Sequence, residues 1–150
     1  LVGDACLIVQ KAVMFHFGVL TSTMHMSWMR HVAGRLESRY RYSGKLVYNN
    51  FPWPKDISPK QKAAVEAAAK DVLEVRKQYP NASLADLYDP HAMPGDLHKA
   101  HTKLDRAVDR CYRSQPFSND VDRMAYLFAL YEAYTAPLSK PSSRRAKRGE

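Results

Sequence analysis

Arginine and tyrosine alternate in one short segment, and this pattern is the first in the sequence that predicts chemistry. Residues 35–45 read RLESRYRYSGK. In an extended chain successive side chains point to opposite sides, so guanidinium groups would lie on one side and phenol rings on the other. Guanidinium groups bind phosphates and guanine edges, whereas phenol rings stack on bases. The segment indicates nucleic-acid contact, and a half-buried strand with solvated arginines is the alternative. We expect the contacts to come from Arg35, Arg39, Tyr40, Arg41, Tyr42 and Lys45.

Two amides and three aromatic residues follow at 47–54, which read VYNNFPWP. Asn49 and Asn50 could hydrogen-bond to bases, but amides beside a proline turn more often satisfy the local backbone. The two prolines restrict the backbone there. We therefore interpret Tyr48–Pro54 as a rigid junction, with Phe51 and Trp53 packed between the two parts of the chain that it joins.

Five more basic residues recur at intervals of four, three, four and three residues, which places them on one narrow stripe of a helix. They are Lys99, Lys103, Arg106, Arg110 and Arg113. Asp105 and Asp109 flank this stripe, and Asp109 lies four residues before Arg113, a favourable spacing for an ion pair. The stripe is either a ridge that contacts phosphates without reading sequence or a solvated face held by ion pairs.

Metal ligation and catalysis find little support among the remaining polar residues. His91, His98 and His101 are the best metal candidates, because the last two could share a helix face. His101 also falls on the inward side of that helix, so we predict no metal site. Cys6 and Cys111 lack Cys-x-x-Cys spacing, and neither is predicted to be a ligand or a nucleophile. The sequence has no glycine-rich nucleotide loop and no serine elbow, so no catalytic residue is predicted.

The distribution of charge favours a polyanionic partner. The formal net charge is +8, and the excess lies in residues 1–57 and 139–150, while residues 58–138 are neutral. Phosphates that are neutralised by a protein release counterions, which supplies much of nucleic-acid affinity. Solubility charge with a disordered tail would give the same totals. The apolar runs fall short of the roughly 18 residues that cross a membrane, so we predict a cytoplasmic protein without membrane contact.

The elements that must position these residues are mainly helical. Two capping boxes, Ser58–Gln61 and Ser83–Asp86, predict helix starts. Apolar periodicity and turn residues predict helices over 58–79, 83–88, 94–112 and 118–136. The first third reads as mixed α/β. Its expected elements are a strand at Ala5–Val9, one helix over Gly18–Ala33 that Gly34 ends, and a strand at Leu46–Tyr48.

The expected fold class is therefore mainly α, with a helical domain of about four helices and a small mixed α/β N-terminal portion. A chain of 150 residues with 45% hydrophobic content can bury one modest core. The expected division is an α/β segment at 1–57, a helical domain at 58–138 and a disordered basic tail at 139–150.

Several stretches, in order, carry a resemblance to a known family. They are Phe17–Arg30, Gly34–Leu36, Ser38–Ser43, Val47–Pro54, Leu84–Pro90, Leu104–Asp109 and Leu127–Glu132. Together they resemble the C-terminal region of class I, S-adenosylmethionine-dependent DNA adenine methyltransferases, in particular fused type II restriction-modification enzymes. The resemblance covers about residues 12 to 138.

This resemblance implies the end of a target-recognition domain followed by a C-terminal helical domain. In that family, the methyl-donor site and a catalytic Asn/Asp-Pro-Pro-aromatic tetrapeptide lie in an upstream domain. Here Asn49-Asn50-Phe51-Pro52 has its proline after the aromatic residue and lacks the adjacent pair. The resemblance thus implies no catalytic residues and no cofactor in this chain, with S-adenosylmethionine in the parent protein and no activity alone.

Double-stranded DNA and the upstream methyltransferase domain of the same polypeptide are the partners that the resemblance implies. Two alternatives from other classes stay open from the residues themselves. One is an independent nucleic-acid-binding module, and the other is a structural helical interaction module without an enzymatic role.

Overall fold

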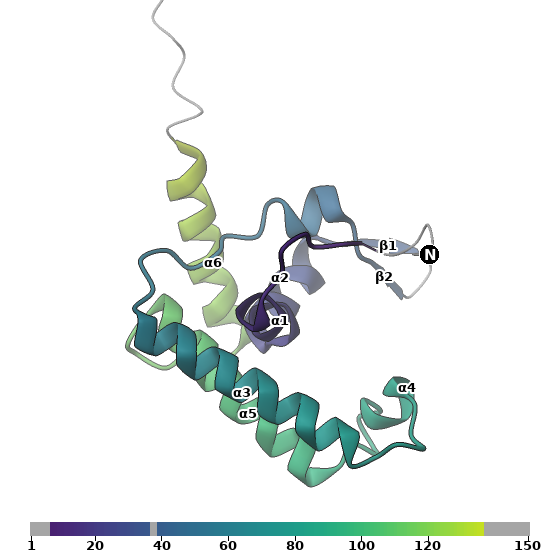
Figure 1. The fold of residues 1–150 in the computed structure, drawn as a ribbon. Helices are drawn as coiled ribbons and strands as arrows, with labels where there is room; N and C mark the ends of the chain where they lie inside the picture. Colours follow the sequence, from purple (N-terminus) through teal and green to yellow (C-terminus); the bar gives the residue numbers. More distant parts are fainter. Residues whose placement is uncertain (1–6, 37–38, 137–150) are drawn as a thin grey trace, which may run out of the picture.

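The computed structural model describes residues 7–36 and 39–136, and the fold in that range is mainly α-helical, as predicted (Figure 1). Its elements are α1 (Met14–Thr21), α2 (Thr23–Val32), β1 (Gly34–Leu36), β2 (Arg39–Arg41), the π-helix η1 (Gly44–Tyr48), α3 (Pro59–Lys77), α4 (Leu84–Leu87), α5 (Gly95–Tyr112) and α6 (Asp120–Thr135). The predicted disordered tail at 139–150 lies outside the described residues. None of the described helices is long and apolar enough to cross a membrane.

Helices α3 and α5 pack side by side and antiparallel. At one end the Gln61 amide donates to the Arg110 carbonyl, with Nε2 and O 2.7 Å apart. At the other end the Tyr79 hydroxyl donates to Asp96 Oδ1 over 2.8 Å. The predicted capping box at Ser58 is present and starts α3. Both helices bury the apolar stripes predicted for them, which include Val65, Ala68, Ala69 and Val72 on α3 and Leu97, Leu104 and Val108 on α5.

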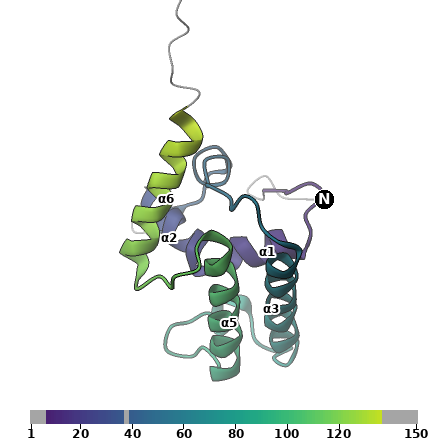
Figure 2. The ribbon, with the colours of Figure 1, turned by 90° about the vertical axis from the view of Figure 1, so that its left-hand side faces the viewer.

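Helix α1 lies against both members of this pair, as the two views agree (Figures 1 and 2). The approach is close at Gly18, which is buried. A Cβ added there would lie 2.8 Å from Val65 Cγ1, 3.2 Å from the Ala69 Cβ and 3.3 Å from Leu104 Cδ1. Only a residue without a side chain lets α1 sit this deep between α3 and α5.

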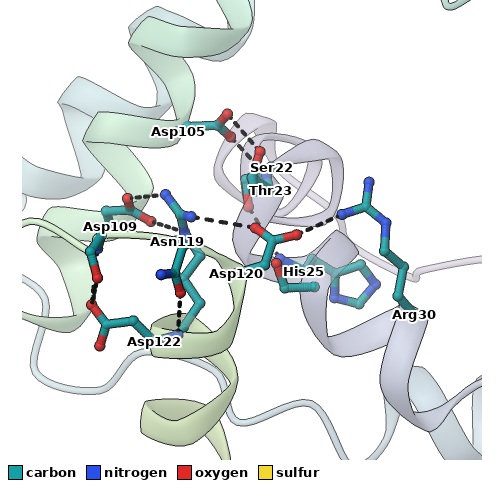
Figure 3. Close-up of polar contacts among 12 residues, drawn as sticks. Ser22, Thr23, His25, Arg30, Asp105, Asp109, Asn119, Asp120 and Asp122 are labelled. Atoms are coloured by element: carbon teal, nitrogen blue, oxygen red, sulfur yellow. Dashed lines mark hydrogen bonds and ion pairs between the residues drawn. The ribbon is translucent and has the colours of Figure 1, made fainter. Parts of the chain in front are cut away.

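The single helix predicted over Gly18–Ala33 is wrong, because the chain forms two helices that meet at Ser22. Ser22 is extended, with φ −78° and ψ 158°, and its side chain accepts from the His25 amide. Serine competes with the helix for backbone hydrogen bonds and therefore favours a cap. Asp105 on α5 then fixes the new helix start (Figure 3). Its two oxygens accept from the Thr23 amide and hydroxyl, each over 2.7 Å.

The predictions of strands at Ala5–Val9 and Leu46–Tyr48 are also wrong within the described residues. Leu7–Val9, the described part of the first, has no regular structure, and residues 46–48 belong to η1. Ser43 caps η1 by accepting from the Leu46 amide. Gly34 starts β1 and has no positive φ, while α2 ends at Val32. These short segments follow tertiary contacts more than local propensity.

The junction after η1 packs its aromatic residues against helices of the first part of the chain. Phe51 is 4% exposed, and its ring stands edge-on to His25 with centroids 4.6 Å apart. Trp53 contacts the ring of His16 on α1, with centroids 5.6 Å apart, and its carbonyl accepts from the Tyr134 hydroxyl on α6. The junction thus touches α1, α2 and α6.

We predict that Gly18→Ala destabilises the fold by about 1 to 3 kcal/mol, since the added methyl group overpacks the contact between α1 and α3. Gly95→Ala is the matched control, because a Cβ there meets nothing within 4 Å. Alanine favours the helix at that position, so the control is neutral or slightly more stable. Urea denaturation of both variants measures the difference, and an unchanged midpoint for Gly18→Ala would contradict the close packing.

Candidate nucleic-acid interface

The arginine and tyrosine segment forms an antiparallel two-stranded hairpin at one edge of the molecule (Figure 1). Gly34 pairs with Arg41, and Arg35 pairs with Tyr40. Gly34–Leu36 and Arg39–Arg41 are thus extended, as predicted, and η1 begins at Gly44 after its cap Ser43. Arg41 is exposed, and Tyr40 and Tyr42 are 41% and 40% exposed. The tyrosines are therefore not core residues of a half-buried strand. For Arg35 and Arg39 the structure gives a strand position only.

Tyr42 ties this hairpin to the core through His25. The Tyr42 hydroxyl lies 3.0 Å from His25 Nε2, and His25 itself is 2% exposed. Burial lowers the pKa of the His25 imidazole to about 4, so the ring is neutral near pH 7. Burial, and then the nearby Tyr48, raises the pKa of the Tyr42 hydroxyl. Sequence reasoning missed this histidine, although its place one turn after Ser22 on the inner side of α2 marks it as a core residue.

Helix η1 presents the other predicted residues from a fixed backbone. The Trp28 indole donates to the Val47 carbonyl, with Nε1 and O 3.0 Å apart. Asn50 Nδ2 donates to the carbonyls of Lys45 and Leu46 over 2.9 and 3.1 Å. The Asn50 amide thus satisfies local backbone, the alternative that the proline turn favoured. Lys45 and Asn49 are exposed.

A pocket of about 990 Å³ lies between the hairpin, η1 and α2. Of the residues predicted to bind nucleic acid, it brings together Tyr40, Tyr42, Lys45 and Asn49. Met26 and Met29 on α2 and Leu7 and Ile8 supply apolar walls, which sequence reasoning did not connect with this site. Aromatic rings beside a cation can stack on a base and contact a phosphate.

The predicted basic stripe on α5 loses one of its five members. Arg113 caps the end of α5 in an extended conformation, and its guanidinium donates to Asp122 over 2.6 Å. The expected pair of Asp109 with Arg113 is wrong. Asp109 pairs instead with Arg123 on α6, and Arg123 Nη2 lies 2.8 Å from Asp109 Oδ2. Arg123 also reaches Asp120, which pairs with Arg30 on α2 (Figure 3). These ion pairs hold the start of α6 against α5 and α2.

The remaining four basic residues, Lys99, Lys103, Arg106 and Arg110, line a groove between α5 and α3. Lys60, at the start of α3, lies on the same groove. Sequence reasoning missed Lys60 because its proximity to the end of α5 depends on the antiparallel packing. Lys103 pairs with Asp71 on α3, with Nζ and Oδ2 2.6 Å apart.

Among the described residues, no group of three metal-binding side chains comes together. His101 lies against Tyr88 instead, with its Nε2 2.6 Å from the Tyr88 hydroxyl, which also accepts from Arg76 Nε. Cys111 is buried, which raises the pKa of its thiol to about 11. Cys6 lies outside the described residues.

Comparison with known proteins adds an independent line of evidence. The family model described as the MmeI C-terminal domain matches residues 57–139, and the model described as the MmeI target recognition domain matches residues 1–55. DNA methyltransferase A of Bacillus subtilis (strain 168) is 41% identical over 128 residues, which is 85% of this chain and 14% of that protein. The structure of the Type IIL restriction-modification enzyme MmeI in complex with DNA has 52% identity and a TM-score of 0.80, over 84% of this chain and 17% of that one.

These matches define a class, that of the recognition and C-terminal parts of restriction-modification methyltransferases, and so confirm the resemblance drawn from the sequence. The C-terminal domain match alone covers more than half of the residues, and the chain belongs to the MmeI family. It spans 14% of the length of the first of these relatives and 17% of the second.

We predict that the buried His25 makes the fold less stable at acid pH. The folded-state pKa is lowered from 6.5 to about 4, so below pH 6.5 the unfolded chain binds the proton more readily. The free energy of unfolding therefore has its highest value above pH 6.5. As the pH falls from 7 to 5, this histidine lowers it by about 2 kcal/mol.

Urea denaturation at both pH values measures this loss, and His25→Gln should reduce it by that amount. His98→Gln, which changes an exposed histidine, is the control and should leave the pH dependence unchanged. An equal pH dependence in wild type and His25→Gln would contradict the assignment.

Proposed function

We propose that this chain contacts duplex DNA as the recognition part of a larger methyltransferase. The observation that carries the proposal is the exposed arginine and tyrosine hairpin, anchored to a buried histidine. Arg41, Tyr40 and Tyr42 are all exposed on it. The related MmeI enzyme was solved in complex with DNA, and its likeness to this chain supports the same class of ligand.

Within the proposed interface, cations and rings have separate roles. Arg39, Arg41 and Lys45 supply charge for phosphates or guanine edges, with Arg35 in support. Tyr40, Tyr42 and Asn49 contact bases or sugars across the pocket. Asn50 contributes indirectly, because its amide holds the end of η1. The fixed backbone lowers the entropy cost of ordering these side chains on DNA.

The reaction itself belongs to the parent protein in this proposal. An upstream methyltransferase domain of the same polypeptide binds S-adenosylmethionine, takes adenine out of the duplex and transfers the methyl group. This chain holds the duplex during that step and is inactive alone. The lack of an Asn/Asp-Pro-Pro-aromatic tetrapeptide in its sequence supports this division of labour.

We predict that Arg39→Ala with Arg41→Ala weakens binding to a 20-base-pair duplex at about 50 mM salt. Each lost phosphate contact lowers the slope of log K against log salt by about 0.9, so the double variant should lose up to about 2 in slope. Fluorescence anisotropy across a salt series measures both quantities. The thermal midpoint should stay nearly unchanged, because the arginines are assigned to DNA contact and not to the core.

Lys62→Ala with Lys70→Ala removes the same charge from exposed positions on α3 and is the matched control. It should retain most of the affinity. Equal losses of DNA affinity and thermal stability in the arginine variant would make these arginines structural. Failure of the wild-type chain to bind at about 50 mM salt would sink the DNA contact itself.

A further inference from the structure

The groove between α3 and α5 has an apolar floor on a surface that no described element covers. Its volume is about 760 Å³. Ala64 and Ala67 of α3 form part of the floor and are exposed, and Ala68 and Ala107 complete it. Gln61 and Thr102 also line the groove, and the Gln61 amide donates to the Arg110 carbonyl on α5. Another backbone can approach the four alanines because their side chains are short.

Basic residues form the rim of this groove. On the α5 side Lys99, Lys103, Arg106 and Arg110 follow one another at about one per turn. Lys60 faces them from α3. Asp71 is the acidic residue that pairs with this rim in the described part of the chain, and that pair is exposed. The rim therefore keeps a positive surplus that an acidic partner would neutralise.

The groove faces away from the proposed DNA interface. Val65, Ala69 and Leu104 point toward Gly18 on α1, so they mark the inner side of the α3 and α5 pair. Ala64 and Ala67 lie on the other side of α3. In Figure 1 the hairpin and α1 lie on one common side of this pair. DNA held at the hairpin therefore does not lie over the groove.

We propose that this groove binds an acidic amphipathic α-helix of a separate protein chain. Its small apolar residues pack on the alanine floor, and its carboxylates pair with the rim along α5. Helices pack at about 8 to 10 Å when the contact residues permit, and alanines favour the close end of that range.

The rim sets the length of the partner helix. From Lys99 to Arg110 the stripe covers about 16 Å at 1.5 Å per residue, which is about three turns. A row of phosphates would match the rim charges but would leave the exposed Ala64 and Ala67 methyl groups in contact with water. A helix with an apolar stripe buries them as well, and this burial is the reason to prefer it. The proposal does not rest on DNA binding at the hairpin.

A synthetic 18-residue helical peptide with glutamates along one edge and alanine and leucine along the facing stripe is the probe. We expect it to bind the chain in fluorescence anisotropy, and a scrambled peptide of the same composition to bind at least about tenfold more weakly. Arg106→Glu with Arg110→Glu should weaken binding of the designed peptide by about tenfold or more, because like charges then face each other.

Two further variants separate the groove from general charge attraction. Ala64→Gln with Ala67→Gln keeps the charge, lowers the helix propensity only slightly and fills the floor, so it should also weaken binding by about tenfold. Lys62→Glu with Lys70→Glu makes the same charge change away from the groove and should alter binding less than about twofold.

Three results would overturn the proposal. The first is that the scrambled peptide binds as tightly as the designed one. The second is that Ala64→Gln with Ala67→Gln leaves binding of the designed peptide unchanged. The third is that a 20-base-pair duplex displaces the peptide. The last would assign the groove to phosphates, the role that the basic stripe suggested from sequence. The thermal midpoint of each variant shows whether it is folded. If the charge-reversal variant does not fold, the variants at the exposed Ala64 and Ala67 still test the proposal.

Discussion

The close contact of α1 with α3 and α5 at Gly18 is the constraint on which the rest of the structure depends. Without a side chain at this position, the helix backbone reaches Val65 and Leu104 directly. Helix α1 thereby covers the inner side of the α3 and α5 pair, while the outer side of the pair stays exposed. Because α2 follows α1 directly at Ser22, the depth of this contact also fixes where α2 begins relative to α5.

From there the placement passes along the chain by hydrogen bonds between elements. Asp105 on α5 caps α2 through Thr23, and α2 then carries His25 and Trp28 to the hairpin and η1. His25 meets Tyr42, and the Trp28 indole donates to Val47 in η1. Each of these two segments is thus held by one buried side chain of the same helix. The helical part therefore determines where the arginine and tyrosine hairpin stands.

Local signals in the sequence were sufficient for the long helices but not for their connections. The capping box at Ser58 and the apolar stripe of α5 depend on neighbours three and four residues apart, so they could be read directly. The break at Ser22, the π-helix at 44–48 and the Asp109–Arg123 pair depend on partners distant in sequence. For the same reason the spacing of Asp109 and Arg113 fitted a local rule, although each pairs instead with a residue of α6. The extended conformation of the arginine and tyrosine segment was predicted from its alternation. Its pairing into a hairpin was not, and the pocket beneath it also requires α2.

The depth of α1 has a consequence for exchanging specificities between relatives. A chimaera cut at the proline junction near residue 55 would separate α1 from α3, although the two share the Gly18 contact. The donor α1 would then pack against the host residues at positions 65, 69 and 104. Any host residue larger than Val65, Ala69 or Leu104 would push α1 away from α3 and α5. A graft that keeps the host α1 and α2 and replaces only residues 34–48 leaves that seam intact. Under the proposed function, the segment to exchange is therefore shorter than the whole stretch before the prolines.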